Sequence, residues 1–146
     1  MIFSKGMRSQ RLIGIEFDGP SLAWNRPIDR LAAIVGCDDE RLFTSGEELA
    51  AYSLKTQEML WSTPLPRTAA WSKPLVTRNR LYQFTSRGIC EIDKQTGTPV
   101  RIFRGVDLDA MGGGLLVSSK ALVTVSNLGI AAYPRPAAAG GSTEQS

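Results

Sequence analysis

The sequence predicts an all-β chain, a partial β-propeller built of four-stranded antiparallel blades. Three observations lead to this fold class. A unit of one shape returns about every 40 residues, each full copy holds four short strand-like segments, and the segments that join the copies recur as well. Four short strands in a repeat of about 40 residues are typical of a propeller blade rather than of a solenoid turn.

The repeated unit is clearest at 51–61, AYSLKTQEMLW, and returns at 91–101, EIDKQTGTPVR. An earlier copy lies at 14–24, GIEFDGPSLAW, and a truncated copy starts at Ala132. Apolar and polar residues alternate ahead of the turn in each copy. This alternation is expected of a half-buried strand, whose successive side chains point to opposite faces.

Each unit reverses in a short polar segment. In the copy at 91–101, Asp93 and Thr96 supply side-chain acceptors, and Gly97 tolerates the positive φ that a tight reversal needs. The strand after the reversal ends in Trp24 or Trp61. Because a buried indole covers a large apolar area and keeps one N–H donor, each tryptophan is expected to pin its strand to a neighbouring blade.

The linkers repeat together with the strands. AWNRPIDRLAA at 23–33 aligns without a gap with LWSTPLPRTAA at 60–70. A duplicated unit explains this agreement. A β-sandwich, the structural alternative, gives no reason for the linker and the hairpin to recur together.

The repeats predict where blades begin and end. Propeller blades are expected over 11–136, after an irregular lead-in at 1–10 and before a disordered tail at 137–146. Within that range we expect a half blade at 11–28, full blades at 29–66 and 67–106, and an incomplete blade at 110–136. The last blade lacks a fourth strand in this prediction because Pro134 and Pro136 have no amide donor for the ladder.

Composition excludes several classes of function. The chain has 146 residues and a formal charge of +3, with lysines and arginines scattered rather than gathered in a stripe, which argues against nucleic-acid binding. No segment approaches the roughly 18 apolar residues of a membrane span, and residues 1–10 lack the apolar core of a secretory signal. Histidine is absent, so no zinc ligand set is available. Cys37 and Cys90 are expected to be small buried residues, with a disulfide or thiol chemistry as the alternative.

The unit resembles the tryptophan-docking motif A-x-D-x-x-T-G-x-x-x-W of the pyrroloquinoline-quinone (PQQ)-like, quinoprotein-dehydrogenase-like propeller repeat family. The resemblance covers residues 11–133. Docking positions of the motif are held by Trp24, Ala51, Thr56, Trp61, Asp93, Thr96 and Gly97. Four positions depart from it: Ser53 and Gln57 in one copy, Glu91 and Arg101 in the next. Arg101 replaces a docking tryptophan, and its head group is expected to reach water.

Members of that family include quinoprotein dehydrogenases, a propeller lipoprotein that helps to assemble outer-membrane proteins, and many noncatalytic repeat proteins. The dehydrogenases hold PQQ and calcium with carboxylate, amide and aromatic side chains, often beside a pair of adjacent cysteines. No such set falls on a matching position of this chain. We therefore assign no catalytic, cofactor-binding or metal-binding residue and expect no cofactor here. The family is mostly extracytoplasmic (periplasmic), but no signal peptide is visible, so the compartment stays open.

Three further patterns have a plainer interpretation than ligand binding. Asp107 and Asp109 form a D-x-D pair without the downstream acidic ligand of a calcium loop, which favours a solvated loop. The three glycines at 112–114 lack the strand–helix context of a phosphate-binding loop and suit the flexible or tightly packed start of a blade. The acidic run at 38–40 is expected to be a solvated hairpin turn.

Aromatic residues in the strands are the remaining candidates for a ligand site. Trp71, Tyr82 and Phe84 could stack a flat ligand, but alternating aromatics in strands more often pack between sheets. A Ser–His triad is not available without histidine.

A propeller avoids exposed strand edges by closing a ring, usually of four to eight blades. About three and a half repeats leave the ring open, so we expect either a C-terminal piece of a longer propeller or self-association of two copies into a ring of about seven blades. The favoured function is a noncatalytic scaffold that binds a protein partner. The alternative is part of a quinoprotein-type oxidoreductase whose site for PQQ and calcium lies outside this chain.

Overall fold

The computed structural model describes residues 2–5, 11–15, 22–27, 33–66, 74–104, 114–126 and 129–134. All regular secondary structure in these ranges is β, in fourteen strands that form four antiparallel sheets, here called sheets I to IV. Sheet I contains β1 (Ile2–Lys5), β2 (Arg11–Ile15) and β3 (Leu22–Pro27). Sheet II contains β4 (Ala33–Cys37), β5 (Arg41–Ser45), β6 (Glu48–Ser53) and β7 (Met59–Pro64). Sheet III contains β8 (Leu75–Val76), β9 (Arg80–Thr85), β10 (Gly88–Asp93) and β11 (Pro99–Phe103). Sheet IV contains β12 (Gly114–Val117), β13 (Ala121–Ser126) and β14 (Gly129–Pro134).

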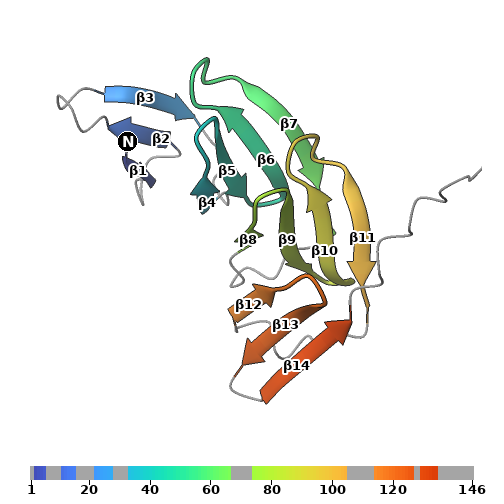
Figure 1. The fold of residues 1–146 in the computed structure, drawn as a ribbon. Coiled ribbons are helices and arrows are strands. Elements are labelled where there is room, and N and C mark those ends of the chain that lie inside the picture. Colours follow the sequence, from blue (N-terminus) through green and yellow to red (C-terminus); the bar gives the residue numbers. More distant parts are fainter. Residues whose placement is uncertain are drawn as a thin grey trace, which may run out of the picture.

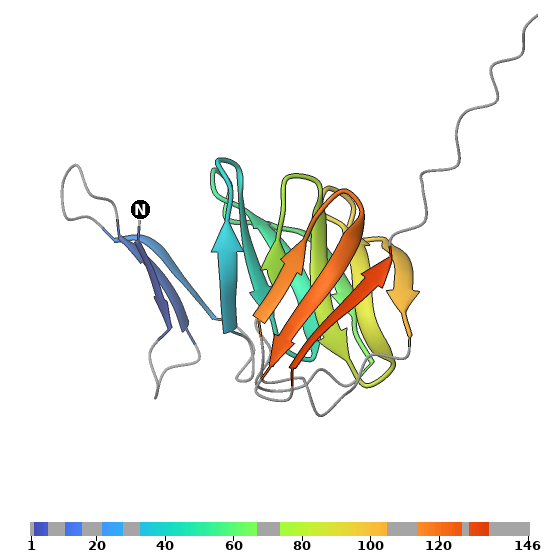
Figure 2. The ribbon, with the colours of Figure 1, turned by 60° about the horizontal axis from the view of Figure 1, so that its bottom comes forward.

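Every sheet is a meander in which strands adjacent in sequence pair with one another. The sheets follow one another along an arc, with β4, β8 and β12 on its inner side and β7, β11 and β14 on its outer side (Figure 1). In the second view sheet IV lies in front of sheet III, and sheet I stands to the left of β4 (Figure 2). Consecutive innermost strands also touch, since β1 contacts β4 and β4 contacts β8.

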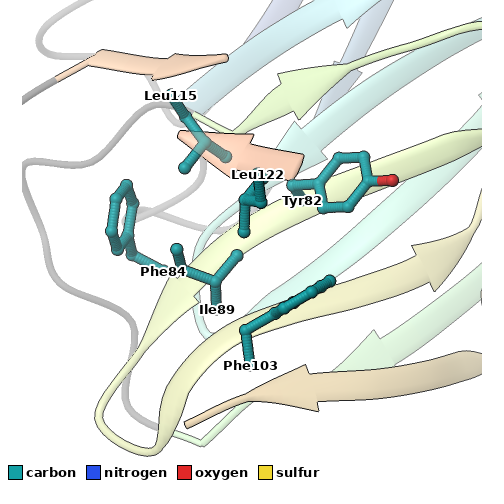
Figure 3. Packing of buried hydrophobic residues seen from close by; sticks show 6 residues of the cluster. All are labelled: Tyr82, Phe84, Ile89, Phe103, Leu115 and Leu122. Carbon is teal, nitrogen blue, oxygen red and sulfur yellow. The ribbon is translucent and has the colours of Figure 1, made fainter. Parts of the chain in front are cut away.

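The core lies between the sheets rather than within one layer. Trp24 of sheet I packs with Leu42, Ile34 and Tyr52 of sheet II and with Leu54 in the turn after β6. Sheets II and III share a second cluster, in which Phe43, Leu49, Ala51 and Trp61 meet Leu81, Cys90 and Ile92. A third cluster joins sheets III and IV through Tyr82, Phe84, Ile89, Phe103, Leu115 and Leu122, and its side chains interlock across the junction (Figure 3).

Sheet III buries apolar side chains on both faces of β9 and β10. Leu81 and Ile92 face sheet II, whereas Tyr82 and Ile89 face sheet IV, and all four are at most 1% exposed. A strand covered on both faces has no solvent side, so it loses the apolar–polar alternation of a half-buried strand.

The structure differs from the predicted boundaries at the N-terminus. The lead-in at 1–10, predicted to be irregular, contains β1, which pairs with β2 through Ile2↔Ile15 and Lys5↔Leu12. Four residues are too few for periodicity to reveal a strand, and its pairing with β2 stabilises it. The predicted tail at 137–146 lies outside the described residues.

The two cysteines have different environments and remain free thiols. Cys90 is buried between sheets II and III, and burial, helped by the negative charge of Glu91, raises the pKa of its thiol. Cys37 is exposed at the end of β4, so the expectation of two buried cysteines is wrong for this residue. The final residue of a strand borders a turn, where no second sheet covers it.

Candidate functional site

The most elaborate polar contact among the described residues is the junction where Trp61 of β7 meets the turn between β10 and β11. The Trp61 Nε1–H donates to the Lys94 carbonyl oxygen at 3.3 Å. Two residues further along β7, the Thr63 hydroxyl donates to the Gly97 carbonyl oxygen at 2.5 Å. The indole lies so close over Gly97 that a Cβ there would be 2.6 Å from Trp61 Cε3. The strand of one sheet is thereby bound to the turn of the next.

The receiving turn is shaped by Asp93 and Gly97. One Asp93 oxygen accepts hydrogen bonds from the backbone N–H groups of Gln95 at 3.0 Å and Thr96 at 3.1 Å, and from the Thr96 hydroxyl at 3.2 Å. Hydrogen bonding from the Thr96 amide is the main reason that the pKa of Asp93 lies below its usual value, with further help from Gln95 and Arg80. Gly97 has φ of +74°, in the left-handed region that glycine favours.

Charged groups reinforce the same junction. The Lys94 ammonium is 2.9 Å from Asp38 Oδ2 in the turn between β4 and β5 of sheet II. Arg41 Nη1 donates to the Lys94 carbonyl oxygen at 3.2 Å, so this carbonyl accepts from both Arg41 and Trp61. The run at 38–40 is therefore not simply a solvated turn: Asp39 and Glu40 are exposed, but Asp38 is a half-buried bridge between two sheets. The spacing of residues in the sequence could not show that the turn containing Lys94 lies opposite the turn containing Asp38.

Acid should weaken this bridge. Burial alone raises the pKa of Asp38, but hydrogen bonds from Lys94 and from the backbone N–H groups of Glu40 and Arg41 outweigh it, and the folded-state pKa is lowered from 3.8. Because the unfolded chain then binds the proton more readily, the stabilisation is fully present above the unfolded pKa and is lost as the pH falls through the lower folded value.

We expect the free energy of unfolding in urea to decline more steeply between pH 6 and about pH 3 for the wild type than for Asp38→Asn. The exposed Asp39→Asn variant is the matched control and should retain the wild-type pH dependence. An Asp38→Asn protein with the same acid sensitivity as the wild type would contradict the bridge.

Sheets I and II meet in a related way. Trp24 lies opposite Gly14 in the ladder, as Trp61 lies opposite Ala51. Its side chain is 1% exposed and packs against Leu42 and Tyr52. Trp24 is thus the more deeply buried of the two anchors, because Trp61 is only half-buried.

The junction of sheets III and IV has a charged row in the equivalent place. Where sheet II aligns Phe43, Ala51 and Trp61 across its strands, sheet III aligns Tyr82, Glu91 and Arg101. Glu91 is 1% exposed, and its Oε1 accepts a hydrogen bond from the Tyr82 hydroxyl at 3.2 Å. Arg101 Nε lies 3.1 Å from Glu91 Oε2, and Arg80 Nε lies 3.5 Å from Oε1. Arg101 therefore pairs with a buried carboxylate instead of simply reaching water.

Two openings border the Trp61 junction. An open cleft of about 900 Å³ is lined by Leu60, Trp61, Lys55, Arg41 and Gln95 among others. A smaller hollow of about 320 Å³ is lined by the cationic side chains Arg41, Arg78, Arg80 and Lys94 among others. Two of those cations are already neutralised, since Arg80 pairs with Asp93 and Lys94 pairs with Asp38. The hollow is thus a salt-bridge cluster between sheets.

The structure brings five of the seven predicted docking residues to one junction: Ala51 and Trp61 from sheet II, with Asp93, Thr96 and Gly97 from sheet III. Trp24 belongs to the preceding junction. Thr56 is exposed in the turn between β6 and β7, where its amide donates to the Ser53 hydroxyl at 3.0 Å. The neighbouring Gln57 has φ of +63°, in the place that Gly97 occupies in sheet III.

Sequence reasoning missed Lys94, Thr63 and Glu91. Lys94 acts through its backbone carbonyl, which carries no residue-type signal, and its side chain pairs with a residue far away in sequence. Glu91 could have been found, because Glu91 and Arg101 depart from the motif together and are direct partners in the ladder. Two opposite charges on paired positions predict an ion pair.

The other candidates have mixed outcomes. Tyr82 and Phe84 are each 1% exposed in the core between sheets III and IV, so they pack between sheets as favoured. Trp71, Asp107 and Asp109 lie outside the described residues, as do the first two of the three glycines at 112–114. In the described part of the chain, no three His, Cys, Asp or Glu side chains gather as a metal site would require. No helix there is long and apolar enough to cross a membrane.

Four meander sheets placed face to face along an arc define a partial β-propeller, the fold class predicted from the sequence. Solved structures share this fold. BamB from Moraxella catarrhalis superposes with a TM-score of 0.62 at 15% identity over 88% of this chain and 44% of its own. The computationally designed proteins Ika4 and Ika8 each give a TM-score of 0.61 at 11% identity over 86% of this chain, covering 79% and 40% of theirs.

This chain thus spans less than half the length of BamB. No protein-family model matches the sequence, and no curated protein matches it with significance. At these identities the likeness concerns the fold alone.

Proposed function

We propose that this chain is a noncatalytic propeller segment that acts by binding protein, as a rigid scaffold. The observation that carries the proposal is the outer face of sheet IV. Leu115 and Leu122 point to sheet III, so the alternate residues of the same strands point away from it. We call this surface the free face; it comprises Leu116, Val123, Val125, Ile130 and Ala132.

The free face is aliphatic and open to solvent. Ile130 is 76% exposed and Leu116 is 61% exposed, the two highest values among the large apolar side chains described. Contiguous apolar surface on a folded protein is typical of an interaction site. A flat sheet face without convergent polar groups suits another protein surface better than a small molecule, which binds in a concave pocket with a few placed polar groups.

The strand edge beside the free face offers a second means of attachment. Sheets II and III each have a fourth, outermost strand, β7 or β11, whereas β14 is the outermost described strand of sheet IV. An edge strand presents backbone N–H and C=O groups that can pair with an added strand. A protein partner can therefore use side chains on the free face and backbone pairing along β14.

Site-specific photo-crosslinking tests the proposal. A photoreactive amino acid at position 130 or 116 of the full chain should give protein adducts in cells, identified by mass spectrometry. The same probe at Lys120, exposed in the turn between β12 and β13, is the control and should give few. An absence of protein adducts at both free-face positions would contradict the proposed function.

We also propose that the chain itself binds neither PQQ nor calcium, which distinguishes a scaffold from the oxidoreductase alternative. A ligand that binds only the native state raises the melting temperature by mass action. We expect saturating PQQ with calcium to leave the Tm unchanged, with each compound tested alone as a control. A rise in Tm that needs both together would revive the alternative.

A further inference from the structure

We infer that the protein that covers the free face is a second copy of this chain, docked head to tail through its sheet I. This inference rests on the proposed function, because it names the partner of the same surface. The two exposed ends of the arc, the free face of sheet IV and the outer face of sheet I, are the two halves of a junction that the chain already forms internally.

The free face repeats the positions that sheet III buries. Ile130 pairs with Val125 in the ladder as Ile89 pairs with Phe84, and Leu116 pairs with Val123 as Leu75 pairs with Tyr82. Ile89 and Phe84 are 0% and 1% exposed because sheet IV covers them, whereas Ile130 and Val125 are 76% and 37% exposed. The free face is therefore a junction surface that lacks only the next sheet.

Sheet I places Ile13 and Asn25 at the ladder positions that face the preceding sheet in sheets II and III. In the three ladders, Trp24 lies opposite Gly14, Trp61 lies opposite Ala51, and Arg101 lies opposite Glu91. When these pairs are superposed, Ile13 of sheet I takes the position that Ala50 holds in sheet II and Cys90 holds in sheet III. Those two residues are 1% and 3% exposed. The side chains of Ala50 and Cys90 point to the face of their sheet opposite Trp61 and Arg101, which is the face toward the preceding sheet. Ile13 faces away from sheet II in the same sense, beside its ladder partner Asn25.

A second copy satisfies both ends at once. Every internal junction pairs two unlike faces, so the contact between copies is of the head-to-tail type, which closes into a ring when the rotation allows it. Four sheets per chain give about eight in two copies, within the usual four to eight blades of a propeller.

Two charged substitutions block the two ends separately. Ile130→Glu places a charge on the free face at a position exposed enough to leave folding intact. Asn25→Glu does so on sheet I, where Asn25 is exposed and already accepts the Arg11 Nε–H at 2.6 Å, so the new carboxylate keeps a partner. Lys120→Glu, a charge change in an exposed turn, is the control. Circular dichroism verifies that each variant is folded.

Light scattering after size exclusion then gives the mass of each protein. We expect twice the chain mass for the wild type and Lys120→Glu, and the single-chain mass for Ile130→Glu and for Asn25→Glu. Mixing the two blocked variants should restore a one-to-one dimer, because one unblocked free face then meets one unblocked sheet I. A dimer through two free faces would instead ignore Asn25→Glu and would not be restored by mixing.

The outcomes separate the two proposals. If the wild type keeps the single-chain mass at protein concentrations up to hundreds of micromolar, the inference that a second copy covers the free face is wrong. In that case adducts of a different protein at position 130 would leave the scaffold role standing. Loss of both the adducts and the dimer would overturn the two together. A dimer that neither Ile130→Glu nor Asn25→Glu disrupts would show that the copies meet elsewhere, which also overturns the head-to-tail contact.

Discussion

Gly97→Ala is expected to destabilise the chain by about 2–5 kcal/mol, summing a backbone cost and a steric cost. The backbone cost arises because φ is +74°, where an L side chain is disfavoured. The steric cost arises because the new Cβ would lie 2.6 Å from Trp61 Cε3 and 2.9 Å from Thr63 Oγ1. The indole cannot retreat without losing its hydrogen bond to Lys94, so neither cost is easily relieved.

Two glycines provide matched controls for Gly97→Ala. Gly129 also has a positive φ, of +145°, but a Cβ there would meet nothing within 4 Å, so Gly129→Ala carries a backbone cost of its own without a steric cost. Gly114 has neither a positive φ nor a close neighbour, and Gly114→Ala should change stability by less than about 0.5 kcal/mol.

A double-mutant cycle with Trp61→Ala completes the test. Trp61→Ala alone should cost about 3 kcal/mol, the lower end for a large core residue, because the indole is half-buried. With the indole removed, Gly97→Ala should cost clearly less than it does in the wild type, since the ring no longer opposes the Cβ and only Thr63 Oγ1 remains close to it. Additive effects in urea unfolding would mean that Trp61 and Gly97 are not in contact.

Arg101→Met is the second substitution with a large expected effect. It leaves the Glu91 carboxylate, 1% exposed, without its closest cation. Removing one partner of a buried ion pair costs about 3–5 kcal/mol, and we expect about 3 kcal/mol here because Arg80 remains 3.5 Å from the same carboxylate. The exposed Arg104→Met should stay within about 0.5 kcal/mol and serves as the control.

The compensating variant separates charge pairing from simple loss of packing. Glu91→Ala with Arg101→Trp reproduces the aromatic–alanine–tryptophan row that sheet II carries at Phe43, Ala51 and Trp61. Replacing a buried ion pair by apolar groups is often neutral or stabilising. The free energy of unfolding of the double variant should therefore be well above that of Arg101→Met. If Arg101→Met and Arg104→Met behaved alike, Arg101 would not be pairing with a buried charge.

The repeats were sufficient to predict the propeller fold. Turn residues such as Asp93 and Gly97, the anchor positions Trp24 and Trp61, and the recurring linkers all act locally or at fixed spacing. Local signals survive in a sequence because a strand's period and a turn's φ are properties of a few adjacent residues. The strand β1 escaped prediction for the opposite reason, because its four residues form a strand only by pairing with β2.

The sequence by itself determined the blade unit, its turn chemistry and the identity of its anchors. Only the tertiary structure decided which groups meet between sheets: the anchor Trp61 lies against the backbone of Lys94 and Gly97, Asp38 pairs with the Lys94 ammonium, and Glu91 lies between Arg80 and Arg101. It also decided which apolar face stays open, since Ile89 and Ile130 occupy the same place in the repeat. The difference between them is that sheet IV covers Ile89 whereas no described sheet covers Ile130, and contacts between repeats depend on the arc along which the sheets are stacked.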